Sequence, residues 1–266
     1  MRQDLDDALA LTPTGANLFS ADVSTSWWTF DAAYGGWALA LAARAVAASD
    51  GARGELVSLN AIFPAAIREG KLRIAVELTR KRARTDFWSV ALFPEATPDE
   101  AAVKVDLVMT SRRKSDLTFA STRPDATPFA DCPEFNFGGF GPRWCENYDQ
   151  RLAAGEPFNV NDRPLTRMWI KDVSERTLDV AGLIAMSDTT MPRTFLIAKE
   201  PVMSSTVSFS MHILATTDEI AAQGSEPIMI EGDSDAVRDG AYDERSRLWG
   251  ADGRLLAVSN QLAFYR

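Results

Sequence analysis

A single carboxylate stands near the end of an apolar run in the second half of the chain. The run reads AGLIAMSDTTMPRTF over residues 181–195, and Asp188 is its only acid. Burying a charged carboxylate without partners is unfavourable, so such an acid is usually paired, exposed at a helix end, or functional. A helix-end turn with Thr189 and Thr190 ahead of Pro192 is the structural alternative. A base that takes a proton from water is the chemical alternative.

Other reactive side chains are few. His212 is the only histidine of the chain, and neither Cys132 nor Cys145 has a histidine nearby in the sequence. This composition disfavours a Cys–His nucleophile, a Ser–His–Asp triad and a histidine-rich metal site. A disulfide between the two cysteines is geometrically possible, but we expect two reduced thiols. We also expect no metal ion and no cofactor.

The first half of the chain predicts one buried helix followed by an antiparallel sheet. Residues 32–48 are almost all apolar or small, so a helix there should be enclosed on most sides. Apolar and polar residues then alternate with period two, which is typical of strands with one buried face. The predicted strands span residues 55–63, 71–80, 85–93 and 103–111.

The second half repeats this order after an irregular connection. Residues 119–145 are rich in proline, glycine and phenylalanine without periodicity, which indicates an ordered crossing loop. We therefore divide the chain into halves at 1–118 and 146–266. In the second half, residues 164–174 indicate a strand or a helix entry, 178–188 a buried helix, and 204–214 a strand. Three further strands follow, in EPIMIEGDS, AYDERSRLWG and GRLLAVSNQLAFYR, so the halves look like a weak internal duplication.

Composition and charge limit the classes of function. The chain has 266 residues, of which 46% are hydrophobic, and a net charge of −9 that argues against non-specific nucleic-acid binding. The longest apolar stretch, 32–43, is too short to cross a bilayer, and the acidic N-terminal residues do not resemble a signal peptide. We expect a cytoplasmic protein that does not bind membranes.

Specific segments resemble the acyl-CoA thioesterase II family of the thioesterase-like superfamily. YGGWALALAARA is similar to the glycine-pair start of the family's first central helix, and SLNAIFPAAIREGKLRIAVELTRKRARTDF to the strands that follow. RLWGADGRLLAVSNQLAFYR resembles the closing hairpin and last strand. The resemblance covers nearly the whole chain. It implies an α+β double hotdog fold, in which each of two tandem halves has a central helix wrapped by an antiparallel sheet.

The resemblance also implies a catalytic set. The family's catalytic Asp, Thr and Gln match Asp188 in AMSDTTMP, Thr206 in STVSFSM and Gln261 in AVSNQLAF. A carboxylate can take the proton of a water while a hydroxyl and an amide orient that water toward a thioester carbonyl. Backbone N–H groups at Gly35 and Gly36 could steady the oxyanion, although close packing explains a glycine pair equally well.

Two strand faces and one basic turn remain open to more than one interpretation. Alternation places Thr206 with Ser208, Ser210 and His212, on a face that is either solvated or lines a cleft between the halves. Gln261 is either a site residue or an ordinary edge-strand glutamine. In the turn that the family usually writes Arg-x-Gly-Arg-Ser, Arg82 and Arg84 could meet coenzyme A phosphates or lie at a solvated strand end.

Three functions follow from these alternatives. The leading hypothesis is an acyl-CoA thioesterase of fatty acid metabolism that hydrolyses an acyl-CoA to free acid and CoA through an activated water. The second is a non-catalytic acyl-CoA or lipid-binding protein, because Trp37 follows the glycine pair and could narrow the pocket. The third, a hydratase, needs an Asp–His pair that this sequence lacks near Asp188. Hotdog sheets tend to pair through exposed edges and faces, so a homo-oligomer is also expected.

Overall fold

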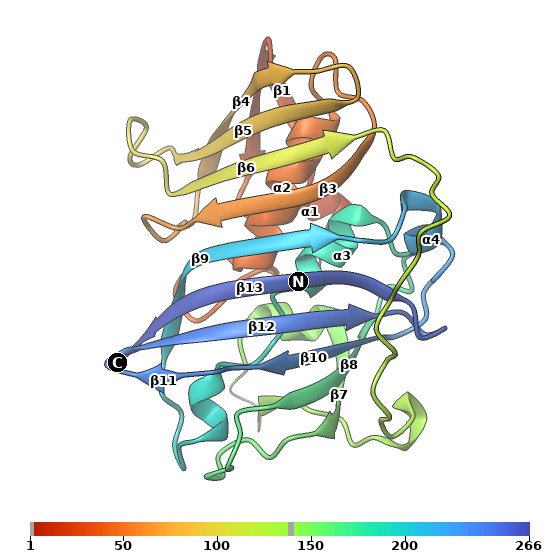
Figure 1. Ribbon diagram of the computed structural model, residues 1–266. Helices are drawn as coiled ribbons and strands as arrows, with labels where there is room; N and C mark the ends of the chain where they lie inside the picture. The colour runs from red at the N-terminus through yellow and green to blue at the C-terminus, as the bar shows by residue number, and fades with distance from the viewer. Residues whose placement is uncertain (1–2, 138–140) are drawn as a thin grey trace.

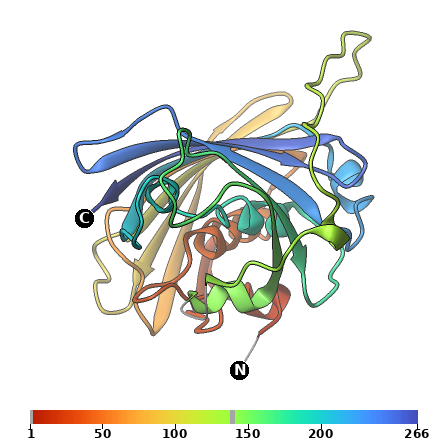
Figure 2. The same ribbon diagram turned by 90° about the horizontal axis from the view of Figure 1, so that it is seen from below.

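The computed structural model describes residues 3–137 and 141–266, and their central feature is one curved antiparallel sheet with two helices on its inner side (Figure 1). The helices are α1 Leu5–Ala8, α2 Gly35–Ala47, α3 Val180–Met186 and α4 Thr217–Ala221, with short 3-10 turns at Phe129–Asp131 (η1), Arg143–Asn147 (η3) and Arg193–Leu196 (η4). Figure 2 shows α2 and α3 beneath the arch of the sheet. This arrangement confirms the predicted α+β fold with central helices wrapped by an antiparallel sheet.

Each half of the chain contributes an equivalent set of strands. The first half supplies β1 Thr12–Gly15, β2 Leu18–Asp22, β3 Glu55–Ile62, β4 Lys71–Lys81, β5 Thr85–Pro94 and β6 Val103–Thr110. The second supplies β7 Tyr148–Ala154, β8 Thr166–Asp172, β9 Ser204–Ile213, β10 Ile228–Asp233, β11 Val237–Arg238, β12 Ala241–Trp249 and β13 Leu255–Tyr265. The spatial order β1-β2-β4-β5-β6-β3-β9-β13-β12-β10-β8-β7 has matching halves on either side of the β3–β9 pair.

The β3–β9 pair joins the two half-sheets edge to edge. Asn60 lies opposite Ser210, and Ser58 lies opposite His212. The halves therefore share one continuous sheet, where the sequence suggested one separate sheet for each half. Strand pairing removes two exposed edges, which would otherwise be open to unwanted association.

Period-two alternation locates most of the strands, but not all of them. The strands predicted after each helix are present, and residues 164–174 contain strand β8. The alternation missed β1, β2 and β7, which precede the helices. Every residue of β1 is exposed, and β7 mixes partly buried residues without a clean period. Both lie at the ends of the sheet, where one side has no partner strand and the hydrophobic pattern is weak.

The core forms between α2 and the inner face of the sheet. Helix α2 buries Leu39, Leu41 and Trp37 completely, as its nearly all-apolar sequence predicts. It packs against α3 and against strands β4, β5 and β6, whose inward side chains include Ile74 and Leu92. Burial of these side chains is the dominant favourable term in the folding of such a layer. The core fixes the start of α2 beside the end of α3.

The connection between the halves follows the outer rim of the molecule. Phe135 and Phe137 pack on the core, and η3 returns the chain to β7. Phe119 is 93% exposed, on a segment that projects beyond the sheet in Figure 2. Phe140, part of the predicted crossing loop, lies outside the described residues. We keep the division into 1–118, 119–145 and 146–266 as a proposal. Within the described part of the chain, no helix is long and apolar enough to cross a membrane.

Candidate active site

The carboxyl group of Asp188 caps a helix from the other half of the chain. Asp188 follows the last turn of α3, and its Oδ2 accepts a hydrogen bond from the Gly36 N–H, 2.8 Å away in the first turn of α2. Tyr34, which precedes α2, makes no side-chain capping bond. Unpaired N–H groups at a helix start carry partial positive charge and attract an anion. Asp188 thus supplies the negative group that this helix lacks.

The surroundings of Asp188 make it a stronger base than an ordinary aspartate. Burial raises the pKa of Asp188 to about 7, the negative charge of Glu244 adds to the rise, and the Gly36 N–H opposes it. A general base works best when its pKa lies near the working pH. The residue as a whole is partly buried, so part of it remains accessible to solvent.

The two glycines of the pair at the start of α2 allow the helices to approach. A Cβ atom on Gly36 would lie 2.5 Å from the Ala185 carbonyl oxygen, and one on Gly35 would lie 2.8 Å from Asp188 Oδ2. From the sequence we expected the backbone N–H groups of Gly35 and Gly36 to act as oxyanion donors. In the structure the Gly36 N–H holds Asp188, so it is available to an oxyanion only after the carboxylate releases it.

Thr206 lies on the inner face of the sheet, and the face predicted for it is wrong. Leu262 lies opposite Ser208, but its neighbour Ala263 lies opposite Thr206. Val207 is therefore an extra residue in β9, a β-bulge, which shifts the alternation by one position. The bulge turns Thr206 inward beside Ala263, which is almost fully buried.

The remainder of β9 follows the predicted faces. Phe209, Met211 and Ile213 are buried, and His212 is exposed on the outer face. A sheet separates His212 from the inward-facing Thr206. The only histidine of the chain is therefore on the wrong side of the sheet to act with the inner site.

Thr206 and Gln261 interact directly. The Thr206 hydroxyl donates to Gln261 Oε1 at 2.8 Å, across the β9–β13 pair. This bond fixes the amide plane and leaves its NH₂ group oriented as a donor. Gln261 shares the inner face with Ser259 and Ala263, both buried. The small neighbours and the hydrogen bond both distinguish it from an ordinary edge-strand glutamine, since β13 is a central strand.

Glu244 is a further residue of the inner site that was not predicted from the sequence. This residue lies in β12 directly opposite Gln261, and its side chain is only 2% exposed. Its Oε2 atom is 3.2 Å from Nε of Arg193, which is completely buried. Alternation in AYDERSRLWG could have found it, because Glu244 falls on the same face as Tyr242 and Leu248, both buried. Glu244 connects the Thr206–Gln261 pair to the electrostatic environment of Asp188.

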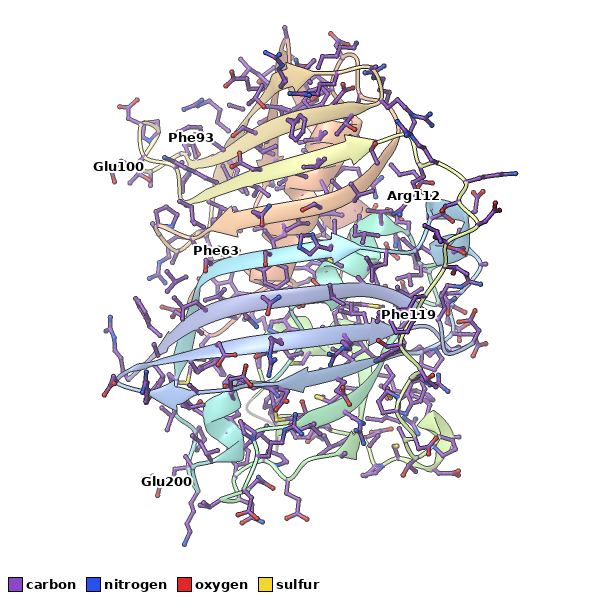
Figure 3. The ribbon with its side chains drawn as sticks, in the orientation of Figure 1. Phe63, Phe93, Glu100, Arg112, Phe119 and Glu200 are labelled. Atoms are coloured by element: carbon purple, nitrogen blue, oxygen red, sulfur yellow. The ribbon has the colours of Figure 1, made fainter. Side chains whose placement is uncertain are left out.

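The structure does not bring Arg82 and Arg84 to this site. Both lie in the β4–β5 turn, at the end of the sheet where β3 begins. Asp188 lies near Phe63, just beyond the other end of β3, because Phe63 and Asp188 both approach Gly35. The eight residues of β3 span about 25 Å at the usual rise of a strand. Figure 3 shows Phe63 and Arg112, which follows β6, at opposite ends of the sheet.

Arg112 and Trp37 also have structural roles. The guanidinium of Arg112 donates to Glu55 and to the carbonyl groups of residues 213–215, so its donors are engaged within the fold. Trp37 is fully buried and donates to the Ala8 carbonyl, so it belongs to the core near α1 and does not line the site.

Neither cysteine is an activated nucleophile, and the described residues form no metal site. Cys132 and Cys145 are free, and burial raises the pKa of both, that of Cys145 to about 12. A thiol with such a pKa is almost entirely protonated at neutral pH. Among residues 3–137 and 141–266, no three His, Cys, Asp or Glu side chains are grouped to hold a metal ion.

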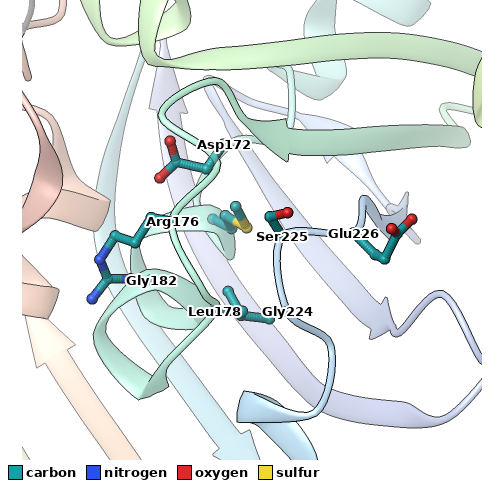
Figure 4. A pocket seen from close by; sticks show the side chains of 8 residues that line it. Asp172, Arg176, Leu178, Gly182, Gly224, Ser225 and Glu226 are labelled. Atoms are coloured by element: carbon teal, nitrogen blue, oxygen red, sulfur yellow. The ribbon is translucent and has the colours of Figure 1, made fainter.

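The start of α3, which corresponds to the start of α2, is arranged differently. Asp179 caps its own helix by accepting from the Gly182 N–H at 2.7 Å, and Arg176 pairs with Asp179 and with Asp6. A depression beside it, lined by Arg176, Gly182, Glu226 and their neighbours, has about 10 Å³ of space (Figure 4). This volume suits about one water and not an acyl group.

These features define the class of the protein: a double hotdog fold with a polar inner site at the junction of its halves. A family model for the acyl-CoA thioesterase N-terminal domain matches residues 24–113, and one for the C-terminal domain matches residues 122–265. The chain therefore belongs to the acyl-CoA thioesterase family. Membership supports thioesterase activity in general terms.

Solved structures agree with this fold over the whole chain. A conserved protein of unknown function with a hot dog fold from Alicyclobacillus acidocaldarius is 27% identical, with a TM-score of 0.94 over 100% of this chain and 99% of that chain. The acyl-CoA thioesterase II TesB2 from Mycobacterium marinum is 16% identical, with a TM-score of 0.79 over 99% and 98%. The tesB protein of Mycobacterium avium subs paratuberculosis is 13% identical, with a TM-score of 0.78 over 99% and 98%. No curated protein matches the chain.

Proposed function

We propose that this protein hydrolyses the thioester of an acyl-CoA to a free acid and CoA, with a water molecule activated by Asp188. The observation that carries the proposal is the Thr206–Gln261 hydrogen bond on the inner face of the sheet, with Glu244 linking that pair to a basic Asp188. Family membership supports the acyl-CoA substrate, because both matched models are acyl-CoA thioesterase domains.

The chemistry needs only groups that the chain supplies. Asp188 takes a proton from water as the water oxygen forms a bond to the thioester carbonyl carbon. Thr206 and Gln261 hold that oxygen in line with the carbonyl, which lowers the entropic part of the barrier. Collapse of the tetrahedral intermediate breaks the C–S bond, and the proton on Asp188 passes to the departing thiolate. The products are a carboxylic acid and the thiol of CoA, with no covalent enzyme intermediate.

A thiol-release assay over short, medium, long and aromatic acyl-CoAs tests the proposal. We expect hydrolysis of at least one substrate by the wild-type protein and its loss in Asp188→Ala. Tight binding of acyl-CoA without thiol release would favour the non-catalytic binding protein. The structure removes one motive for that alternative, since Trp37 packs in the core. Absence of both binding and release would contradict both functions.

The pH dependence of kcat/KM should report the basicity of Asp188. Only the ionised carboxylate accepts a proton, and the pKa of Asp188 is raised to about 7. The rate should therefore rise with pH up to about 7, falling about tenfold per unit well below that midpoint. A flat profile between pH 5 and 8 in the purified protein would show that Asp188 is not the base.

Thr206→Val should reduce kcat while the fold is kept. Valine matches threonine in shape but cannot donate to Gln261 Oε1, so the amide loses its orientation. Loss of this bond should lower kcat roughly tenfold to a hundredfold. Thr206→Ser, which retains the hydroxyl, is the matched control and should keep most of the activity. Equal rates in the Val and Ser variants would argue against an orienting role.

We propose a cytoplasmic protein that forms a homo-oligomer. The outer face of the sheet carries exposed apolar side chains, among them Ile62, Leu262 and Phe264, which could be covered by another copy. Light scattering of the purified protein would measure the molar mass and decide this point.

The exposed histidine argues against a hydratase. A hydratase of this fold relies on an Asp–His pair, and His212 lies on the outer face of the sheet. The Thr206–Gln261 pair instead offers hydrogen bonds suited to a bound water. Hydrolysis is therefore the reaction that these residues support best.

A further inference from the structure

The Arg193–Glu244 ion pair is the most buried pair of opposite charges among the described residues, with side chains 0% and 2% exposed. Two charges are costly to remove from water and are tolerated when they are paired and hydrogen-bonded. Stability alone does not explain why this pair is present, because apolar side chains of similar volume could fill the same space.

Arg193 is fixed from all sides. Its guanidinium donates to the carbonyl groups of Met191, Pro164 and Gly232 and to the Thr166 hydroxyl. Gly232 leaves the required space, since a Cβ atom there would lie 3.2 Å from the guanidinium. The cation is thus locked against β8 and β10, and it presents Nε to Glu244.

Glu244 is held in turn at the centre of the inner site. It faces Gln261 across the β12–β13 pair, and the Ser246 hydroxyl donates to its Oε1 at 3.3 Å. Because Arg193 follows Asp188 by five residues, the same ion pair ties the segment after Asp188 to the sheet. The pair therefore sets both the position of a negative charge and the position of the chain that carries Asp188.

The other ionisable groups near Asp188 do not compete with Glu244. The charge of Asp188 also acts on the phenols of Tyr34, Tyr148 and Tyr242, and burial is the main cause that raises the pKa of each above its usual value. These three groups are consequently neutral at pH 7. Among side chains, Glu244 has the largest electrostatic influence on the pKa of Asp188.

We propose that Glu244 is a positioning residue for the water-activating step: Arg193 locks its carboxylate inside the inner site, directly opposite Gln261. This inference rests on the proposed function for its catalytic meaning. The electrostatic coupling between the two carboxylates does not depend on turnover, so it can be measured even in an inactive protein.

The test compares Glu244→Gln with the wild type in two readouts. The first is the pH profile of kcat/KM, and the second is the titration of the Asp188 carboxyl carbon by NMR, assigned by its loss in Asp188→Asn. A neutral amide of the same shape removes the negative charge, so both midpoints should move down by roughly one pH unit. Unchanged midpoints in a folded Glu244→Gln protein would overturn the inference.

Two control variants separate charge from packing. Glu231→Gln removes another arginine-paired glutamate, which lies on β10 and pairs with Arg167 and Arg247, and it should leave the midpoint unchanged. Glu244→Asp keeps the charge and a partner for Arg193, so it should stay near the wild-type midpoint. A shift in Glu244→Asp as large as that in Glu244→Gln would assign the effect to packing and overturn the inference.

A second variant covers failure to fold. If Glu244→Gln strands the Arg193 cation and unfolds, Glu244→Gln combined with Arg193→Met removes the stranded charge, and the Asp188 midpoint is expected to fall in that protein too. An unmoved midpoint there would count against the inference. A wild-type protein that releases no thiol would defeat the proposed function alone, since the NMR titration would still decide the coupling.

Discussion

Asp188→Asn is expected to lower kcat/KM by about 10²- to 10⁴-fold on the best acyl-CoA substrate, the range typical of losing a general base. Asparagine keeps the shape of the side chain and an oxygen that can accept from the Gly36 N–H, so the start of α2 stays capped. It cannot take a proton from water at any working pH. A thiol-release assay on the purified variant measures the effect.

The stability of this variant shows whether the lost activity is chemical. The pKa of Asp188 is raised on folding, so its ionisation costs stability as the pH rises from about 4 toward 7, and asparagine carries no such cost. Asp188→Asn should therefore melt no lower than the wild type at pH 8. Asp179→Asn is the matched control, because it alters a second helix-capping carboxylate outside the site and should leave kcat/KM unchanged. Wild-type turnover in Asp188→Asn would exclude the mechanism.

Arg193→Met is expected to have the largest effect on stability, a loss of about 3–5 kcal/mol in the free energy of unfolding. Methionine fills part of the space but leaves Glu244 buried without its cation. The carbonyl groups of Pro164 and Gly232 also lose a donor. Urea denaturation followed by circular dichroism measures the change.

An exposed arginine provides the comparison. Arg163 pairs with Asp233, but its side chain is 66% exposed, so Arg163→Met should cost at most about 1 kcal/mol. If both variants lost the same small amount, the buried pair would not hold the fold together. The expected difference follows from where each pair lies, since solvent screens one and not the other.

The sequence could predict the architecture because the core elements show two simple hydrophobic patterns. The apolar run that becomes α2 reflects a helix enclosed on most sides, and the alternation that becomes β4, β5 and β6 reflects strands with one buried face. The acidic residue after α3 was also recognisable, because a carboxylate is conspicuous among apolar residues. The two strands at the ends of the sheet were missed because β1 is exposed throughout and β7 is partly buried along most of its length, so neither shows a clean alternation.

The inner site could be predicted only in part. The family resemblance identified Thr206 and Gln261. Alternation wrongly grouped Thr206 with Ser208, Ser210 and His212, because no residue in STVSFSM signals the bulge at Val207. The bulge depends on how β9 pairs with β13, which is a long-range property. Glu244 was within reach of the alternation argument, whereas its buried partner Arg193 comes from a segment with no period at all.

The unequal helix starts have a consequence for stoichiometry. The two halves have corresponding helix starts, yet α3 is capped by its own Asp179 and covered by Arg176, while α2 receives Asp188 from the opposite half. The start of α3 therefore has a structural role only, whereas the start of α2 holds the carboxylate that we propose as the base. Each polypeptide should accordingly take up one equivalent of an acyl-CoA analogue in calorimetry, with one half-molecule serving as scaffold for the other.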